Sequence, residues 1–259
     1  MQTSMIRTTA TGLTTMAGFS FETEPRTCPE HGEYTSMKTP VGWSDCTVCN
    51  ANRQRAELFR VEVESARISH MRKAGVPDRY HAKSLETYAA NNPGQAKALR
   101  VAEAYAADFP AARTSGRGLI MCGTPGTGKT HLAVGIMHRV IAAGYSALFA
   151  VVLDAMREVK GTYRKDSAMT EADVVDKLTL PDLLVLDEIG NQYGTDAEKI
   201  ILSSVINTRY NAMKPTILLS NLAMDGLTKE LGDRVIDRMR EGGGRMVIFD
   251  WDSHRGAQA

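Results

Sequence analysis

The feature that most constrains this chain is a glycine-rich motif of eight residues, Gly123-Thr124-Pro125-Gly126-Thr127-Gly128-Lys129-Thr130. The motif matches the pattern G-x-x-x-x-G-K-[ST] at every fixed position. It follows an apolar run at 119–122 and precedes a helix-like stretch at 131–143, which is the strand, loop and helix order of a phosphate-binding loop. The alternative is a glycine-rich turn that closes a strand–helix unit, but such a turn does not require all the fixed positions. The motif therefore indicates a nucleoside triphosphate site.

Each part of the motif has a role in this interpretation. The glycines let the backbone curl so that successive N–H groups point at the phosphates, and the following helix N-terminus adds the positive end of its dipole. Lys129 is placed to reach the β and γ phosphates, and Thr130 can offer a hydroxyl to Mg²⁺. ATP and Mg²⁺ are the expected cofactors. The predicted nucleotide-binding residues are Gly123, Thr124, Pro125, Gly126, Thr127, Gly128, Lys129, Thr130 and His131.

Two acidic residues and one asparagine follow later apolar runs. Asp187 and Glu188 come directly after residues 183–186, and Asn221 closely follows the run at 216–219. Because ligands gather at the carboxyl ends of parallel strands, these side chains should lie beside the phosphate loop. We expect Asp187 to help hold Mg²⁺, Glu188 to orient the attacking water, and Asn221 to reach the γ-phosphate or that water. The alternative for all three is to cap the turns that follow the strands.

Strands and helices alternate through the part of the chain that follows the motif. This alternation predicts right-handed βαβ units and a mainly parallel sheet with helices on both faces, so the expected fold class is α/β. The expected strands are 146–152, 182–186, 216–219 and 246–249, and the expected helices are 153–165, 170–178 and 196–212.

Four metal-ligating side chains cluster near the start of the chain. Cys28 and His31 are separated by two residues, as are Cys46 and Cys49, with a short stretch between the pairs. This is the spacing of a structural zinc site, in which three thiolates and one imidazole close the tetrahedron and leave no position for a catalytic water. A surface thiol cluster or a redox pair is the alternative. Cys122, in the strand before the phosphate loop, is expected to be a small buried hydrophobic residue.

The chain divides into four expected parts. Residues 51–73 are charged and free of Pro and Gly, and Leu58, Val61, Ile68 and Met71 form one apolar stripe, so this stretch predicts a long helix. The exposed face of that helix is either a partner surface or an ordinary solvated face. The expected parts are a flexible N-terminus at 1–27, a zinc-binding module with its helix at 28–73, a linker and helix at 74–110, and an ATPase domain at 111–259.

The charge balance restricts the partners. A formal net charge of +1 argues against a chain that is basic throughout, so any contact with nucleic acid must come from a local patch. Lys160, Tyr163 and Arg164 form such a patch, in which cations take phosphates and the ring stacks on a base; a solvated helix end is the alternative. No apolar run is long enough to span a bilayer and residues 1–21 lack a signal pattern, so we expect a cytoplasmic protein without a membrane partner.

Two C-terminal segments carry a specific resemblance. The phosphate loop, the Asp-Glu pair and the later Asn together resemble the core of AAA+ ATPases, and residues 231–240 and 249–255 are similar to those of DnaC-type bacterial and phage helicase loaders. The resemblance extends from about residue 72 to residue 255 and implies a five-stranded sheet. It also implies that Arg238 is an arginine finger acting in a neighbouring subunit's site and that Arg255 is a second sensor. Arg234 and Arg240 share the helix with Arg238, and for each arginine the alternative is a solvated charge.

The resemblance also implies a function. Members of this group, which includes DnaI and IstB, suggest an ATPase that self-assembles into a spiral or hexamer on a DnaB-type replicative helicase and delivers it onto single-stranded DNA. The basic patch would then line the DNA channel, and residues 28–73 would dock on the helicase, although a zinc module can instead touch nucleic acid. Two alternatives are an IstB-like transposition helper that acts on duplex DNA, and a nucleotide-dependent adaptor with little turnover. The acid Glu188 argues against the adaptor.

Overall fold

The computed structural model describes residues 7–8, 13–16, 19–191 and 195–253. These residues divide into two compact units, Met1–Ala66 and Arg67–Ala259. Each unit is described by itself. No helix in the described ranges has the length and apolar character needed to cross a bilayer.

The first unit contains an antiparallel sheet whose strands follow one another in chain order. The sequence predicts no regular structure over residues 1–27, yet the described part of that range forms two strands and most of a third. From Glu22 to Thr27 the only apolar side chain is that of Pro25, so the period-two pattern that reveals a strand is absent there. The strands are β1 Arg7–Thr8, β2 Leu13–Met16, β3 Phe19–Cys28, β4 Gly32–Thr39 and β5 Gly42–Trp43.

The long helix α1, Thr47–Lys73, begins four residues before the predicted start at residue 51. Of the four residues in the predicted apolar stripe, only Met71 is buried. The side chains of Leu58 and Val61 are 65% and 58% exposed. The part of the stripe in the first unit is therefore solvent-accessible in this chain.

The second unit is built on a five-stranded sheet in the order β10-β6-β9-β8-β7. All four strand pairs are parallel, which confirms the predicted α/β fold class. The strands are β6 Leu119–Gly123, β7 Ala147–Val151, β8 Leu183–Ile189, β9 Thr216–Ser220 and β10 Arg245–Phe249. The helices are α2 Pro93–Ala107, α3 Phe109–Ser115, α4 Lys129–Ala142, α5 Val152–Thr162, α6 Glu171–Thr179, α7 Asp196–Asn211, α8 Met224–Leu231 and α9 Asp233–Arg240, with short 3₁₀ turns η1 Asp78–Tyr80 and η2 Glu241–Gly243.

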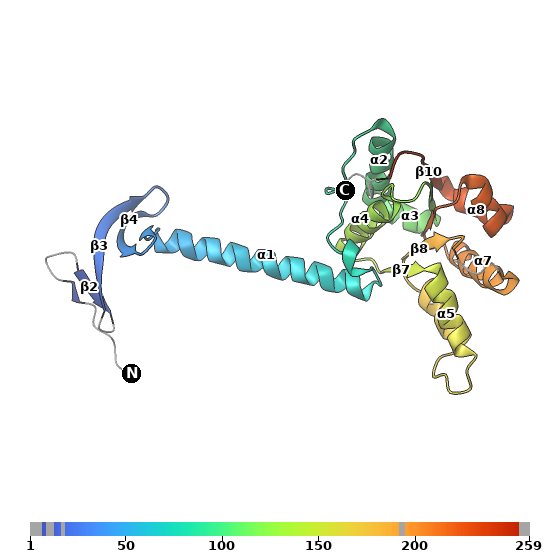
Figure 1. Ribbon diagram of the computed structural model, residues 1–259, viewed down its shortest axis with the longest axis horizontal. Coiled ribbons are helices and arrows are strands. Elements are labelled where there is room, and N and C mark those ends of the chain that lie inside the picture. Colours follow the sequence, from blue (N-terminus) through green and yellow to red (C-terminus); the bar gives the residue numbers. More distant parts are fainter. Residues whose placement is uncertain (1–6, 9–12, 17–18, 192–194, 254–259) are drawn as a thin grey trace. The chain divides into compact units, whose positions relative to one another are not determined.

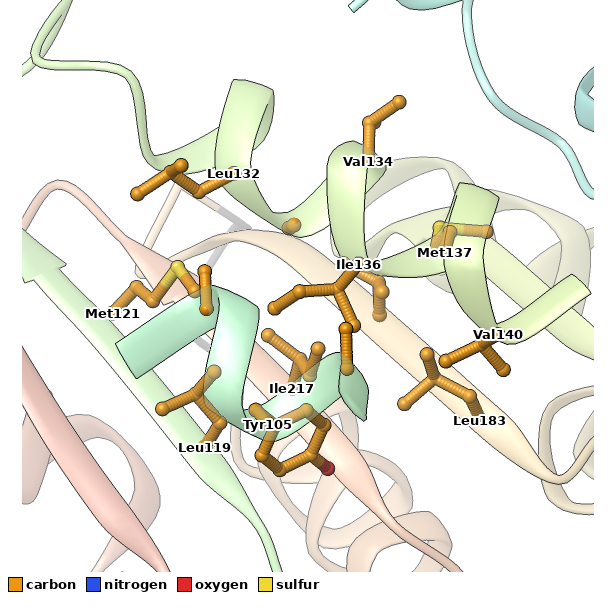
Figure 2. Packing of buried hydrophobic residues seen from close by; sticks show 14 of the residues in the cluster. Tyr105, Leu119, Met121, Leu132, Val134, Ile136, Met137, Val140, Leu183 and Ile217 are labelled. Atoms are coloured by element: carbon orange, nitrogen blue, oxygen red, sulfur yellow. The ribbon is translucent and has the colours of Figure 1, made fainter. Parts of the chain in front are cut away.

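Alternate side chains of the sheet enter two separate cores. Leu119 and Met121 of β6 pack with α2 and α4 on one face (Figure 2). Ile120 and Cys122 point to the other face, where they pack with α5 and with α7 to α9. The two sets of helices lie on opposite sides of the sheet in Figure 1. Cys122 is a buried core residue, as the sequence predicts.

The segment at 74–110 belongs to the second unit rather than forming a separate linker. Its helix α2 starts with a capping box in which the side chain of Asn92 accepts a hydrogen bond from the N–H of Gln95. Helix α2 packs on α4 and β10 and buries Ala102 and Tyr105. The boundary predicted at residue 111 is therefore not a boundary in the structure.

Candidate functional site

The phosphate loop joins β6 to α4 with an open, curled backbone. Gly123, Gly126 and Gly128 have positive φ values of 124°, 77° and 97°, a region that residues with a β-carbon rarely adopt. A β-carbon on Gly123 would lie 2.3 Å from the carbonyl oxygen of Phe249. The loop can therefore curl only because glycine occupies these positions, as the motif predicts.

The lysine and threonine at the end of the motif face the end of β8. The Nζ of Lys129 donates hydrogen bonds to the carbonyl oxygens of Gly123 and Thr124, both at 2.8 Å. The hydroxyl of Thr130 donates to Oδ2 of Asp187 at 3.0 Å. The structure thus brings together the two residues predicted to bind Mg²⁺.

Asp187 lies in a partly buried and polar setting. Its Oδ1 accepts a hydrogen bond from the backbone N–H of Glu188 at 2.7 Å. Burial raises the pKa of Asp187 above that of an ordinary carboxyl, and the hydrogen bonds from Glu188 and Thr130 oppose this rise only in part. Keeping the Asp187 carboxyl ionised therefore costs free energy, and a cation nearby would lower that cost.

The backbone changes conformation at Glu188. This residue has a φ of 61°, in the left-handed region where a non-glycine residue is uncommon and is often held by a functional site. The pairing of β8 with β9 shifts register between Leu186 and Ile189. The irregularity interrupts the strand at the two acids, so that Asp187 and Glu188 both line the cavity beside the phosphate loop.

Asn221 lines the same cavity, whereas Ser220 has a structural role. The hydroxyl of Ser220 donates to the carbonyl oxygen of Ile189 at 2.7 Å and accepts from the N–H of Leu222 at 3.1 Å. Ser220 thus joins β8 to the turn after β9. One cavity is lined by Arg79, Tyr80, Pro125, Gly126, Gly128, Lys129, Thr130, His131, Asp187, Glu188 and Asn221.

Two aromatic residues outside the motif donate hydrogen bonds to the backbone of the phosphate loop. The hydroxyl of Tyr88 and the indole N–H of Trp251 both donate to the carbonyl oxygen of Thr127, at 3.3 and 3.1 Å. The Tyr88 ring also packs edge-on against His131, with ring centroids 5.2 Å apart. Sequence reasoning missed both contacts, because they join the loop to residues far away in the chain and no motif relates them.

The cavity also includes two residues that precede the sheet. Arg79 and Tyr80 belong to η1 and line the cavity together with the phosphate loop. The sequence analysis placed them in a linker and assigned them no role. An arginine next to a tyrosine is too common a pair to serve as a signal by itself.

Arg238, the predicted arginine finger, lies away from this cavity. Arg238 in α9 donates a hydrogen bond to the side chain of Asn207 in α7, and its guanidinium lies over the Tyr210 ring at 4.9 Å from the centroid. It is not among the residues that line the cavity of its own chain. Arg234 and Arg240 are exposed on the same helix. Arg255 lies outside the described residues.

The basic patch at the end of α5 is partly occupied by internal contacts. The Nζ of Lys160 lies 2.7 Å from Oε1 of Glu198, whose side chain is buried. Lys160 keeps the pKa of Glu198 below its usual range through this bond. The hydroxyl of Tyr163 donates to Glu171 at 2.6 Å, although its ring is 65% exposed. Arg164 is exposed. The Tyr163 ring and Arg164 are therefore more accessible to a nucleic acid than Lys160 is.

The four predicted metal ligands meet in the first unit. The ligand atoms of Cys28, His31, Cys46 and Cys49 all lie within 4.8 Å of one another. The Sγ atoms of Cys28 and Cys49 are 3.6 Å apart, which excludes a disulfide of about 2.05 Å and is close to the edge of about 3.8 Å of a tetrahedron with Zn–S bonds of about 2.3 Å. Hydrogen bonds, chiefly from the backbone of Glu30, lower the pKa of Cys28 to about 6, whereas the hydrogen bond with Cys28 raises the pKa of Cys49 to about 11; a cation bound to both sulfurs would favour the thiolate form of each. The donor set therefore fits Zn²⁺.

Comparison with known proteins supports the assignment of an ATP-binding site to the second unit. The family model described as IstB-like ATP binding protein matches residues 57–239. The replicative helicase loader DnaC of Escherichia coli strain K12 is 39% identical over 183 residues, which are 71% of this chain and 73% of that protein. The protein YdaV of the same strain, described as uncharacterized, is 30% identical over 230 residues, 89% of this chain and 90% of that protein.

Solved structures show the same fold. A crystal structure of the DnaC helicase loader superposes with a TM-score of 0.59 at 26% identity, over 67% of this chain and all of that one. A crystal structure of DnaI gives a TM-score of 0.56 at 23% identity, over 70% of this chain and 94% of that one. The chain therefore belongs to the IstB-like ATP-binding family, a group of AAA+ ATPases that includes the DnaC replicative helicase loaders.

Proposed function

We propose that this chain is an ATP-dependent loader that binds a DnaB-type replicative helicase in the cytoplasm and delivers it onto single-stranded DNA. The observation that carries this proposal is the 39% identity to DnaC over 73% of the length of that loader. The complete nucleotide site supports it, because the loop, the acid pair and Asn221 all line one cavity. An adaptor without turnover would not need a held Glu188 beside the phosphate loop.

Each side chain of the nucleotide site has its own proposed role. Thr130 and Asp187, whose oxygens are 3.0 Å apart, offer the hard oxygen ligands that Mg²⁺ prefers, and the ion would neutralise charge on the phosphate oxygens. Lys129 would exchange its two loop carbonyls for phosphate oxygens. Glu188 would accept a proton from the attacking water while Asn221 orients that water.

The cysteine and histidine cluster supports a structural zinc ion. Cys28 ends β3, His31 lies in the turn before β4, and Cys46 and Cys49 flank the start of α1. A tetrahedral ion held by these four residues would fasten the strands to the helix. With four protein ligands it has no open position, so its contribution is to the folding of the module that we propose as the helicase-docking part.

Arg238 is our candidate for an arginine finger that acts in a neighbouring subunit of a spiral or hexamer. Its support is its place on α9, away from the cavity of its own chain, and the contacts with Asn207 and Tyr210 that hold the guanidinium. Arg238→Ala should therefore lower ATP hydrolysis only in the assembled protein. A normal rate under assembled conditions would show that another residue, such as Arg234 or Arg240, supplies the charge.

The proposed contact with DNA is made by the residues at and just after the end of α5. The exposed Tyr163 ring and Arg164 retain the stacking and phosphate-binding chemistry that single-strand binding uses. Lys160 would have to leave the buried Glu198 to take a phosphate. We therefore assign the stronger contribution to Tyr163 and Arg164.

A binding experiment tests the proposed function. The tagged protein is incubated with the replicative helicase, with ATP or without it, and then with single-stranded or duplex DNA. We expect capture of the helicase, and capture of single strands that depends on ATP and is lost in Lys129→Ala. A protein that ignores the helicase and prefers duplex DNA would instead be a transposition helper.

A further inference from the structure

We infer that Arg79 is a nucleotide-binding residue, which contacts the terminal phosphate and makes the site prefer ATP to ADP. This inference deepens the proposed function and rests on it. Arg79 lies in η1, ahead of the sheet and outside every motif of the sequence. Its case depends on four observations: where it lies, how its segment is held, what partners it has, and what charge the site needs.

Arg79 lines the cavity that the phosphate loop and the strand ends form. The same cavity is lined by Thr130, Asp187, Glu188 and Asn221. Thr130 and Asp187 are the residues proposed for Mg²⁺, and Glu188 and Asn221 are those proposed for the attacking water. A guanidinium in the same cavity as these residues could therefore contact the phosphate that a triphosphate has and a diphosphate lacks.

The backbone that carries Arg79 is fastened on both sides. Before it, the carbonyl oxygen of Ala74 accepts a hydrogen bond from the N–H of Phe149 in β7 at 2.7 Å. After it, the buried His81 places Nε2 2.7 Å from the carbonyl oxygen of Val76, and its own carbonyl oxygen lies 3.1 Å from Nε2 of His138 in α4. The segment thus holds a fixed place between β7 and α4, the helix that begins with the phosphate-binding lysine.

The side chain of Arg79 is available for a ligand. It is exposed, and its guanidinium lies over the ring of Tyr80 at 4.7 Å from the centroid. Among the described residues it forms no ion pair, whereas Arg72, near the end of α1, lies 3.7 Å from Asp78. The Tyr80 ring attracts the guanidinium by a cation–π contact, and the guanidinium carries five N–H groups that can donate to an anion.

The charge of the site explains why a second cation is useful. The cavity wall carries two carboxylates, Asp187 and Glu188, and one ammonium, Lys129. A triphosphate adds several negative charges, of which one bound Mg²⁺ offsets two. A guanidinium stays charged at all working pH values and can hold two oxygens of one phosphate at once. Arg79 would therefore bind the nucleotide that carries the additional phosphate more strongly.

The experiment compares equilibrium binding of AMPPCP and ADP to the full-length protein with Mg²⁺ at fixed salt. We expect Arg79→Ala to weaken AMPPCP binding about tenfold or more and ADP binding less than about threefold, because a charge-assisted hydrogen bond contributes about 1.5–3 kcal/mol. Arg79→Lys should recover part of the loss, since it keeps the charge without the planar fork.

Arg72→Ala is the control, since Arg72 is an exposed arginine at the end of α1 that does not line the cavity. It should change neither affinity. Equal losses for AMPPCP and ADP in Arg79→Ala, or no loss at all, would overturn the inference while leaving the proposed ATP site intact, provided that Lys129→Ala abolishes binding of both. Wild-type protein that binds neither nucleotide would overturn the proposed function together with this inference.

Discussion

Asp187 shows how the nucleotide site is held at a cost to stability. Its carboxyl is partly buried and its pKa is raised by that burial, so the ligand-free protein keeps a charge where water would solvate it better. Hydrogen bonds from Thr130 and from the Glu188 N–H lower the cost without removing it. Stability at this residue is given up so that the oxygens are in place for a cation.

Asp187→Asn should therefore raise the melting temperature of the ligand-free protein at pH 7. A carboxyl whose folded pKa is raised above its unfolded value loses stability as the pH rises from the unfolded value, about 3.9, through the folded value. The gain from Asp187→Asn should thus appear at neutral pH and vanish below about pH 4. Thermal melts at several pH values, without nucleotide or metal, check it.

The same variant should gain little from MgATP, whereas the wild type should be stabilised by it. Asp173→Asn is a suitable control, because a backbone hydrogen bond from Thr170 lowers the pKa of Asp173 rather than raising it. A melting temperature that falls in ligand-free Asp187→Asn at pH 7 would show that the carboxylate is well paired, and would contradict this account of the site.

At this scale the sequence predicts the components of the site but not all of its contacts. Lys129, Thr130, Asp187, Glu188 and Asn221 could be found because a motif or a strand end identifies each of them. Their common cavity follows from the parallel sheet. The contacts of Tyr88 and Trp251 to Thr127 and the position of Arg79 could not be found, because they depend on how the segments before and after the sheet pack around the phosphate loop.

Among the elements, a single buried arginine fastens the start of β8 to α7 and β9. The side chain of Arg209 in α7 is 0% exposed. It donates to the carbonyl oxygens of Leu178, Thr179, Pro181, Asp182 and Pro215 and to the hydroxyl of Thr216. These acceptors lie at the end of α6 and at the starts of β8 and β9. Asp187 and Asn221 lie toward the other ends of these two strands, where they line the cavity.

Arg209→Met should destabilise the second unit by about 3–5 kcal/mol, because it leaves a set of buried carbonyl oxygens without donors. The free energy of unfolding in urea measures the effect. Arg234→Met, at an exposed position of α9, should change that free energy by less than about 0.5 kcal/mol. A similar small change in both variants would mean that water replaces the guanidinium without cost.

The elements of the second unit follow their sequence patterns closely, and those of the first unit do not. Helices α6 and α7 start at capping boxes formed by Thr170 and Thr195, which explains why their boundaries could be read from the sequence. The sequence does not predict β3, because from Glu22 to Thr27 the strand has almost only polar side chains and no alternating apolar pattern. In the first unit, the strands are joined by backbone pairing, and the buried side chains of Cys28 and Cys46 belong to the cysteine and histidine cluster.

For the whole molecule, the two units have different sources of stability. Within the first unit the described side chains that are buried are those of Cys28, Ser36 and Cys46. Such a small core cannot offset the entropy of folding, so a bound metal would have to supply much of the stability. The second unit has two large apolar cores and does not need one.

Removal of zinc should therefore unfold the first unit and spare the second. Cys46→Ser, or a strong chelator, should release one equivalent of zinc and abolish a low-temperature transition, while nucleotide binding and the main transition remain. Metal analysis and calorimetry together measure this. Cys122→Ser is the control, since Cys122 lies in the core of the other unit and its loss should release no metal; a full equivalent of zinc retained by Cys46→Ser would contradict the assigned ligands.

The central claim is that ATP in the site controls the delivery of a helicase, and loading onto closed circular single-stranded DNA tests it most directly. Wild-type protein with ATP should place the DnaB-type helicase on the circle in active form. Glu188→Gln should bind ATP and the helicase but release the helicase at least about a hundredfold more slowly, because the water lacks its base. Loading that proceeds equally well without this protein, or with Glu188→Gln at the wild-type rate, would contradict the account.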